Sequence, residues 1–117
     1  MKPQELRIGN IIIKDNEEII VSPYDMINLE LGLNDYKPIF LTEEWLEKFR
    51  FNKTGEDDFD IIFGDIKQIS IRKNKLYNTA NFGVYLNGMR IAIIQYVHQL
   101  QNLYFALTNT ELKLLNQ

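Results

Sequence analysis

The stretch from Tyr96 to Thr108, YVHQLQNLYFALT, is the longest segment of this sequence with a clear helical period. Apolar side chains recur in it at steps of three and four residues, which places them along one face of an α-helix. These side chains are Val97, Leu100, Leu103, Tyr104 and Leu107. The neighbouring flank of the same helix carries His98, Gln101, Asn102 and Phe105. We therefore predict a helix over 97–108 whose apolar face packs on the structure formed by the preceding chain.

Short β-favouring runs separated by turn residues fill much of that preceding chain. We predict strands over residues 11–13, 18–21, 59–63, 66–72, 82–86 and 89–93. Asp15-Asn16 lies between the first two runs, and Asn87-Gly88 lies between the last two. Both pairs predict β-hairpins, because a type I′ turn needs positive φ at its two central residues and these residue types tolerate it.

A short helix is predicted over 42–49. Thr42 can act as its N-cap, and Glu43 and Glu44 follow at the end where the helix dipole favours carboxylates. Trp45, the only tryptophan, is expected to be a core residue of this helix. Residues 24–38 are open to two interpretations. Irregular structure with a short strand is favoured by alternating leucines, and a helical turn that ends at Gly32 is the alternative.

These elements predict an α+β fold in a single domain that spans residues 1–117. A single antiparallel sheet of about five strands would be packed by the C-terminal helix (97–108) and the short helix (42–49). A chain of 117 residues has the usual length of one domain, and its 45% hydrophobic content is ordinary for a globular protein.

Charge is divided unevenly along the chain. Residues 1–65 hold 15 acidic and 7 basic side chains, whereas residues 66–110 hold five basic side chains and no acidic one. The sequence contains no cysteine, which fits a reducing compartment, and no apolar stretch is long enough to span a membrane. We expect a soluble, cytosolic protein that does not contact the membrane.

The sequence offers little support for catalysis or for a cofactor. Nucleophilic catalysis needs a nucleophile within reach of a base, and the chain has one histidine and two serines, neither in a nucleophile-elbow motif. Phosphate-binding glycine motifs are missing, and the acidic run 56–60 lacks the spacing of a calcium loop. We therefore expect no enzyme activity, no cofactor and no metal.

The basic side chains that follow residue 66 are candidates for binding a partner. Lys67, Arg72, Lys73 and Lys75 lie near Tyr77, Phe82 and Tyr85, which could stack on nucleic-acid bases. The sequence pI of about 5.1 is far below that of a dedicated nucleic-acid-binding domain. A lysine-rich turn that keeps the edge of a sheet soluble is the simpler interpretation.

Three strings carry a resemblance to a known group of proteins: ELRIGN (5–10), PIFLTEEWLEKF (38–49) and YVHQLQNLYFALT (96–108). In order and spacing they resemble small proteins of phages, prophages and mobile elements of Bacteroidetes, a group without an established activity. The resemblance implies a mobile-element accessory protein in a bacterial cytoplasm. Small phage accessory proteins often bind and block a host machine, and CRISPR nucleases are among the known targets; this step is an analogy.

The hypothesis that follows is a non-enzymatic protein-binding accessory protein of phage or mobile-element origin, with anti-defence (anti-CRISPR) action as one form of it. Its partner would be a host or defence protein, or a nucleoprotein complex. The predicted contact residues are Arg72, Lys73, Lys75, Arg90, His98, Gln101, Asn102 and Phe105. The alternative is an accessory protein that binds nucleic acid through the basic hairpin around 67–90.

Overall fold

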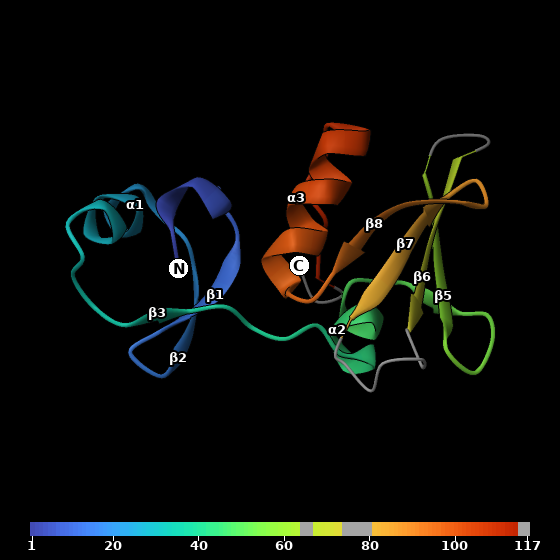
Figure 1. The fold of residues 1–117 in the computed structure, drawn as a ribbon, viewed down its shortest axis with the longest axis horizontal. Helices are drawn as coiled ribbons and strands as arrows, with labels where there is room; N and C mark the ends of the chain where they lie inside the picture. The colour runs from blue at the N-terminus through green and yellow to red at the C-terminus, as the bar shows by residue number, and fades with distance from the viewer. Residues whose placement is uncertain (64–66, 74–80, 115–117) are drawn as a thin grey trace. The chain divides into compact units, whose positions relative to one another are not determined.

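The computed structural model describes residues 1–63, 67–73 and 81–114 of the chain. Contacts between residues divide the chain into two compact units, whose elements are labelled in Figure 1. Unit 1 consists of Met1–Phe40 with Tyr96–Asn109, and unit 2 consists of Leu41–Gln95 with Thr110–Gln117. Among the helices of the described residues, none is long and apolar enough to span a membrane.

Unit 1 contains a three-stranded antiparallel sheet in the order β2-β1-β3, together with three helical segments. Its elements in chain order are the 3₁₀ helix η1 (Pro3–Glu5), β1 (Ile11–Lys14), β2 (Glu17–Ile20), α1 (Pro23–Glu30), β3 (Tyr36–Lys37) and α3 (Val97–Thr108). Asp15 and Asn16 have φ values of 49° and 70° at the β1–β2 turn, so the predicted hairpin is confirmed. Asn109 ends α3 with φ at 56°, in the left-handed region that asparagine tolerates.

The core of unit 1 forms between the sheet and α1. Leu6, Ile12, Val21 and Tyr36 are its buried members, and Ile19, Met26 and Leu29 pack against them. The alternation of side chains along a strand explains which of these residues are buried, because successive side chains point to opposite faces of the sheet. Ile12 is fully buried, whereas Ile20 on the neighbouring strand is 57% exposed.

Unit 2 contains a five-stranded antiparallel sheet in which every strand pairs with its neighbours in the sequence. Its elements are α2 (Glu43–Lys48), β4 (Asn52–Lys53), β5 (Asp58–Phe63), β6 (Lys67–Lys73), β7 (Phe82–Leu86) and β8 (Met89–Ile94). Asn87 and Gly88 have φ values of 49° and 88°, so the second predicted hairpin is also confirmed. Thr42 caps α2 as expected, since its hydroxyl oxygen accepts a hydrogen bond from the Trp45 amide at 3.4 Å.

The two faces of this sheet differ in composition. Phe59, Ile71 and Val84 lie opposite one another on β5, β6 and β7, and all three are fully buried. The adjacent register position brings Asp58, Arg72 and Gly83 together on the other face. Alternation along the strands therefore produces one apolar face and one face with polar and charged side chains.

The α+β class and a five-stranded antiparallel sheet are confirmed, but the elements are distributed differently from the prediction. The hairpin 11–20 builds a second sheet with β3 instead of joining the large one, and α3 belongs to the same unit as that hairpin. Pro38 follows β3 directly, and proline has no N–H to donate to a strand ladder, so the third strand stops after two residues.

Residues 23–30 form α1, so the helical alternative holds for this region and the strand suggested by the leucines does not form. Three residues used in the sequence predictions lie outside the described residues: Ile66, the first residue of the predicted strand 66–72, and Lys75 and Tyr77 of the basic region. In the described part of the C-terminal segment, residues 110–114, no strand forms, and Leu112 is buried.

Replacing Ile12 with alanine should destabilise the fold by about 2–5 kcal/mol, because it removes a fully buried side chain and leaves a cavity in the core of unit 1. The measurement is equilibrium unfolding in urea. Ile20→Ala is the matched control in the same hairpin, and its effect should stay within about 0.5 kcal/mol because this side chain is largely exposed. Equal losses in both variants would contradict the assigned strand faces.

Candidate functional site

Helix α1 starts with a complete capping box. The Ser22 hydroxyl accepts a hydrogen bond from the Asp25 amide at 3.4 Å, and the Asp25 carboxylate accepts one from the Ser22 amide at 2.9 Å. Pro23 occupies the first position of the helix, where its missing N–H removes no helical hydrogen bond. These signals start the helix immediately after β2.

Asp25 also ties α1 to the sheet of unit 1. Its side chain is almost fully buried, and its Oδ1 accepts hydrogen bonds from the Tyr36 hydroxyl at 2.8 Å and from Lys14 Nζ at 3.3 Å. Burial by itself would raise the pKa of the Asp25 carboxyl. The hydrogen bonds to the carboxylate outweigh this effect and lower the pKa to about 2. The inner face of α1 is thereby fixed by an ionised, fully hydrogen-bonded carboxylate.

The end of α1 is a Schellman motif. The Leu33 amide donates to the Asn28 carbonyl at 2.8 Å, and the Gly32 amide donates to the Leu29 carbonyl at 3.2 Å. Gly32 has φ at 69°, a conformation that residues with a side chain rarely adopt. The motif turns the chain sharply, so that Leu33 follows the helix at its C-terminal end.

The outer face of α1 is apolar, which is unusual for a helix whose inner face already fills a core. Tyr24, Ile27 and Leu31 are 79%, 56% and 66% exposed. Their spacing places them within roughly 60° of the helix circumference. Leu33, 51% exposed, follows just beyond the helix end. We call Tyr24, Ile27, Leu31 and Leu33 the apolar stripe; contiguous exposed side chains of this kind mark sites of interaction with other molecules.

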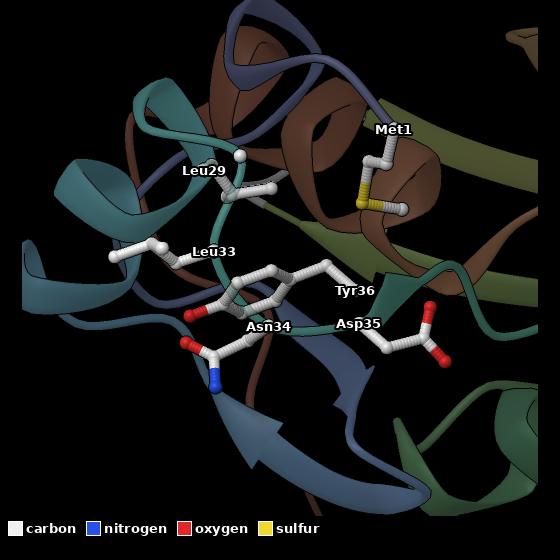
Figure 2. Close-up of a pocket in the computed structure, with 7 residues that line it drawn as sticks. Met1, Leu29, Leu33, Asn34, Asp35 and Tyr36 are labelled. Carbon is white, nitrogen blue, oxygen red and sulfur yellow. The ribbon is translucent and has the colours of Figure 1, made fainter.

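A pocket of about 160 Å³ lies at the C-terminal end of α1 (Figure 2). Leu29 reaches it from α1, Met1 from the N-terminal segment, and the rest of the lining comes from Gly32, Leu33, Asn34, Asp35 and Tyr36. Its volume is close to that of an engineered cavity of about 150 Å³ that holds one benzene molecule. Pockets for cofactors and drug-sized ligands are larger, about 300–1,000 Å³, so this one has room for a single side chain.

Three exposed carboxylates lie near the C-terminal end of α1. Asp35 is part of the pocket lining, and Glu30 precedes Leu31 on α1. The Asp15 carboxylate accepts hydrogen bonds from Asn34 Nδ2 at 3.0 Å and from the Asp35 amide at 2.9 Å. All three carboxylate residues are exposed. We call Asp15, Glu30 and Asp35 the acidic rim.

The predicted contact residues of α3 have structural partners inside unit 1. Gln101 is buried; its Oε1 accepts from the Ile11 amide at 2.8 Å, and its Nε2 donates to the Gly9 carbonyl at 3.3 Å. Asn102 Oδ1 accepts from Asn10 Nδ2 at 2.7 Å. The Arg7 guanidinium lies over the Phe105 ring, 4.2 Å from its centroid. Three of the four flank residues therefore hold the segment before β1, and a contact role for them stays a prediction.

His98, the fourth residue of that flank, is buried instead of exposed. Its ring stacks on Tyr96, with 5.7 Å between the ring centroids. Burial lowers the pKa of the imidazole, and the nearby Glu5 carboxylate opposes this shift only in part. Among the described residues, none provides a hydrogen-bond partner for His98 Nδ1. The lowered pKa favours the neutral imidazole at pH 7.

The predicted basic residues belong to unit 2. The Arg72 guanidinium lies 4.5 Å from the centroid of the Tyr85 ring, and Arg72 Nε is 3.6 Å from Asp58 Oδ1. Arg90 lies opposite Tyr85 in the β7–β8 register, and Lys73 is exposed at the end of β6. Arg72 therefore reaches Tyr85 through its side chain, and Arg90 is the register partner of Tyr85 on β8. Lys75 lies outside the described residues.

The apolar stripe was missed by sequence reasoning, although its signal is present. Tyr24, Ile27 and Leu31 stand at helical spacing, and Ser22-Pro23 with Asp25 gives a helix start. The alternation of Leu29, Leu31 and Leu33 points to a strand in the same residues and conceals the helical pattern. No group of three acidic, histidine or cysteine side chains in the described residues is arranged to hold a metal ion.

Comparisons with protein-family models, with curated proteins and with solved structures found no match to this chain.

Gln101→Ala should destabilise the protein by about 1–3 kcal/mol, because the buried Ile11 amide and Gly9 carbonyl lose their partner. Thermal or urea unfolding measures the change. Ala106→Ser, at an exposed position of the same helix, is the control and should change the free energy of unfolding by less than about 0.5 kcal/mol. A neutral effect of Gln101→Ala would show that this amide does not hold the N-terminal segment.

The Asp25 carboxyl should make the fold sensitive to acid. Its pKa is about 2 in the folded protein and about 3.9 in an unfolded chain. The ionised carboxylate therefore contributes stability that is complete above about pH 4 and is lost as the pH falls towards 2. Urea unfolding at several pH values should show a smaller acid-induced loss in Asp25→Asn than in the wild type. Glu18→Gln, at an exposed position, should retain the wild-type pH dependence.

Proposed function

We propose that this protein is a non-enzymatic protein-binding module that uses the apolar stripe of α1 as its contact surface. The observation that carries the proposal is the outer face of α1, where Tyr24, Ile27 and Leu31 are each more than half exposed. The inner face of the helix is already packed against the core by Met26 and Leu29. The outer stripe thus has no role in the described core of unit 1, and an interaction surface explains why it is apolar.

The dimensions of the site favour a macromolecular partner. The stripe is convex, because it follows the outer face of a helix, and the adjoining pocket has room for only one side chain. A protein segment can cover the whole stripe and place one side chain in the pocket, whereas a metabolite could occupy only the pocket. Helices recognise one another through apolar side chains at such spacing.

The biological setting is proposed from the resemblance to phage and mobile-element proteins of Bacteroidetes. It supports an accessory protein that acts in the cytoplasm of a bacterial cell. A host defence protein, such as a CRISPR nuclease, is the partner that this setting favours.

The open face of the unit 2 sheet supports a second candidate function, binding of nucleic acid. Arg72 and Tyr85 present a cation and an aromatic ring on this face, and Arg90 lies next to Tyr85 in the register. Such groups can contact phosphates and stack on bases. The net charge of the chain, -3 at pH 7, weakens this candidate, because it opposes the approach of a polyanion.

Changing Tyr24, Ile27 and Leu31 to serine together should abolish capture of the partner. Tagged wild-type and variant proteins would be used in parallel pull-downs from host lysate, with half of each lysate treated with nuclease. The protein-binding proposal expects a partner that survives nuclease treatment and is lost from the triple variant. Ile91→Ser and Ile93→Ser on β8, which also replace exposed isoleucines, form the control variant and should keep the partner.

The melting temperature of each variant is measured first, so that loss of binding is separated from loss of the fold. A partner retained by the triple serine variant would overturn the role of the stripe. The nucleic-acid alternative would be established if the captured material is lost after nuclease treatment and from Arg72→Glu, but is kept by the triple serine variant.

A further inference from the structure

The apolar stripe lies in a unit with an excess of negative charge. Unit 1 contains seven carboxylate side chains and four basic ones. Three of these carboxylates form the acidic rim, and all three are exposed. Any partner that covers the stripe therefore meets this negative charge at the helix end, and its own charge decides whether the encounter is favourable.

Lys37 forms a weak ion pair with the acidic rim. Lys37 Nζ lies 3.5 Å from Asp35 Oδ2, and both side chains are more than half exposed. Exposed ion pairs of this kind contribute little, about 0–1 kcal/mol, because water competes with them. A cation supplied by a partner can replace Lys37 at small cost, and burying the rim under a partner strengthens its attraction for that cation.

The pocket has the dimensions and polarity for the side chain that would bring this cation. It holds one side chain, Asp35 contributes to its lining, and it lies at the C-terminal end of α1. The C-terminal end of a helix has a partial negative charge and favours cations. Lysine and arginine combine a positive head with a long apolar stem, which suits a pocket that also contains Leu29 and Leu33.

We infer that the partner presents a basic amphipathic helix to α1. Its apolar side chains pack on the apolar stripe, a lysine or arginine next to them enters the pocket beside Asp35, and a second basic side chain pairs with Glu30 next to Leu31. The inference rests on the proposed function and names the partner's chemistry. The stripe from Tyr24 to Leu31 spans roughly 10 Å, so about two turns of the partner helix cover it.

The same charges disfavour the other surfaces that an apolar stripe could meet. Nucleic acids and anionic lipid bilayers are negative, and the acidic rim would repel them. An acidic amphipathic helix would have the required apolar side chains but would bring like charges together. Charge thus separates the basic helix from the other occupants, which the apolar stripe by itself does not do.

The test uses two fluorescent model peptides of about 14 residues, roughly four helical turns. Both carry leucine at helical spacing; one carries lysine and the other glutamate at all remaining positions. Fluorescence anisotropy with the full-length protein should show at least about tenfold tighter binding of the lysine peptide, or about 1.4 kcal/mol. Raising the salt from about 0.1 M to about 1 M shortens the Debye length to about 3 Å and should remove most of this preference.

Two double variants, each of which removes two negative charges, show which carboxylates attract the lysine peptide. Glu30→Gln with Asp35→Asn should weaken binding of the lysine peptide by roughly three- to tenfold, as expected for two partly exposed ion pairs. Glu44→Gln with Glu47→Gln, on exposed positions of α2, removes two charges from unit 2 and should leave the affinity unchanged. The double variant Tyr24→Ser with Leu31→Ser should bind neither peptide.

Equal affinity for the two peptides, or equal weakening by the two charge variants, would overturn the basic-helix inference. The proposed function would survive such a result if the triple serine variant still lost its lysate partner in the pull-down. A serine variant that keeps that partner would instead overturn the proposed function and, with it, the inference.

Discussion

The amides of Gln101 and Asn102 hold the N-terminal segment of unit 1, because they form hydrogen bonds with the end of η1, with the start of β1 and with the irregular residues between them. The Gly9 carbonyl, just before β1, and the amide of Ile11, the first residue of β1, both form hydrogen bonds with the buried Gln101 side chain. Asn102 extends the network to Asn10 and to the Glu5 carbonyl. Helix α3 thereby fixes the start of the sheet although more than eighty residues separate the two segments.

These contacts join two of the sequence segments singled out above, ELRIGN and YVHQLQNLYFALT. ELRIGN contains Glu5, Asn10 and the Gly9 carbonyl, and YVHQLQNLYFALT contains the amides that bind them. Helix α3 can fill this role because its polar residues at 101 and 102 lie beside the buried Leu100. The flank that sequence reasoning assigned to a partner is thus used within unit 1.

A second buried polar group, the carboxylate of Asp25, has the corresponding role for α1. Its bonds to Ser22, Tyr36 and Lys14 determine which side of this helix faces the core. Once that side is fixed, Tyr24, Ile27 and Leu31 must point outward. The exposure of the proposed contact surface is therefore a consequence of the hydrogen bonds that Asp25 makes inside unit 1.

Sequence reasoning found the elements that depend on neighbouring residues: both hairpins with their Asp-Asn and Asn-Gly turns, and the capped helix α2. Local sterics and capping hydrogen bonds decide these features. Sequence reasoning did not find that the strands form two sheets, that Gln101 is buried, or that α1 exposes an apolar face. Each of these features depends on contacts between residues that are distant in the sequence. The spacing of apolar residues alone does not predict which face of a helix the rest of the fold will cover.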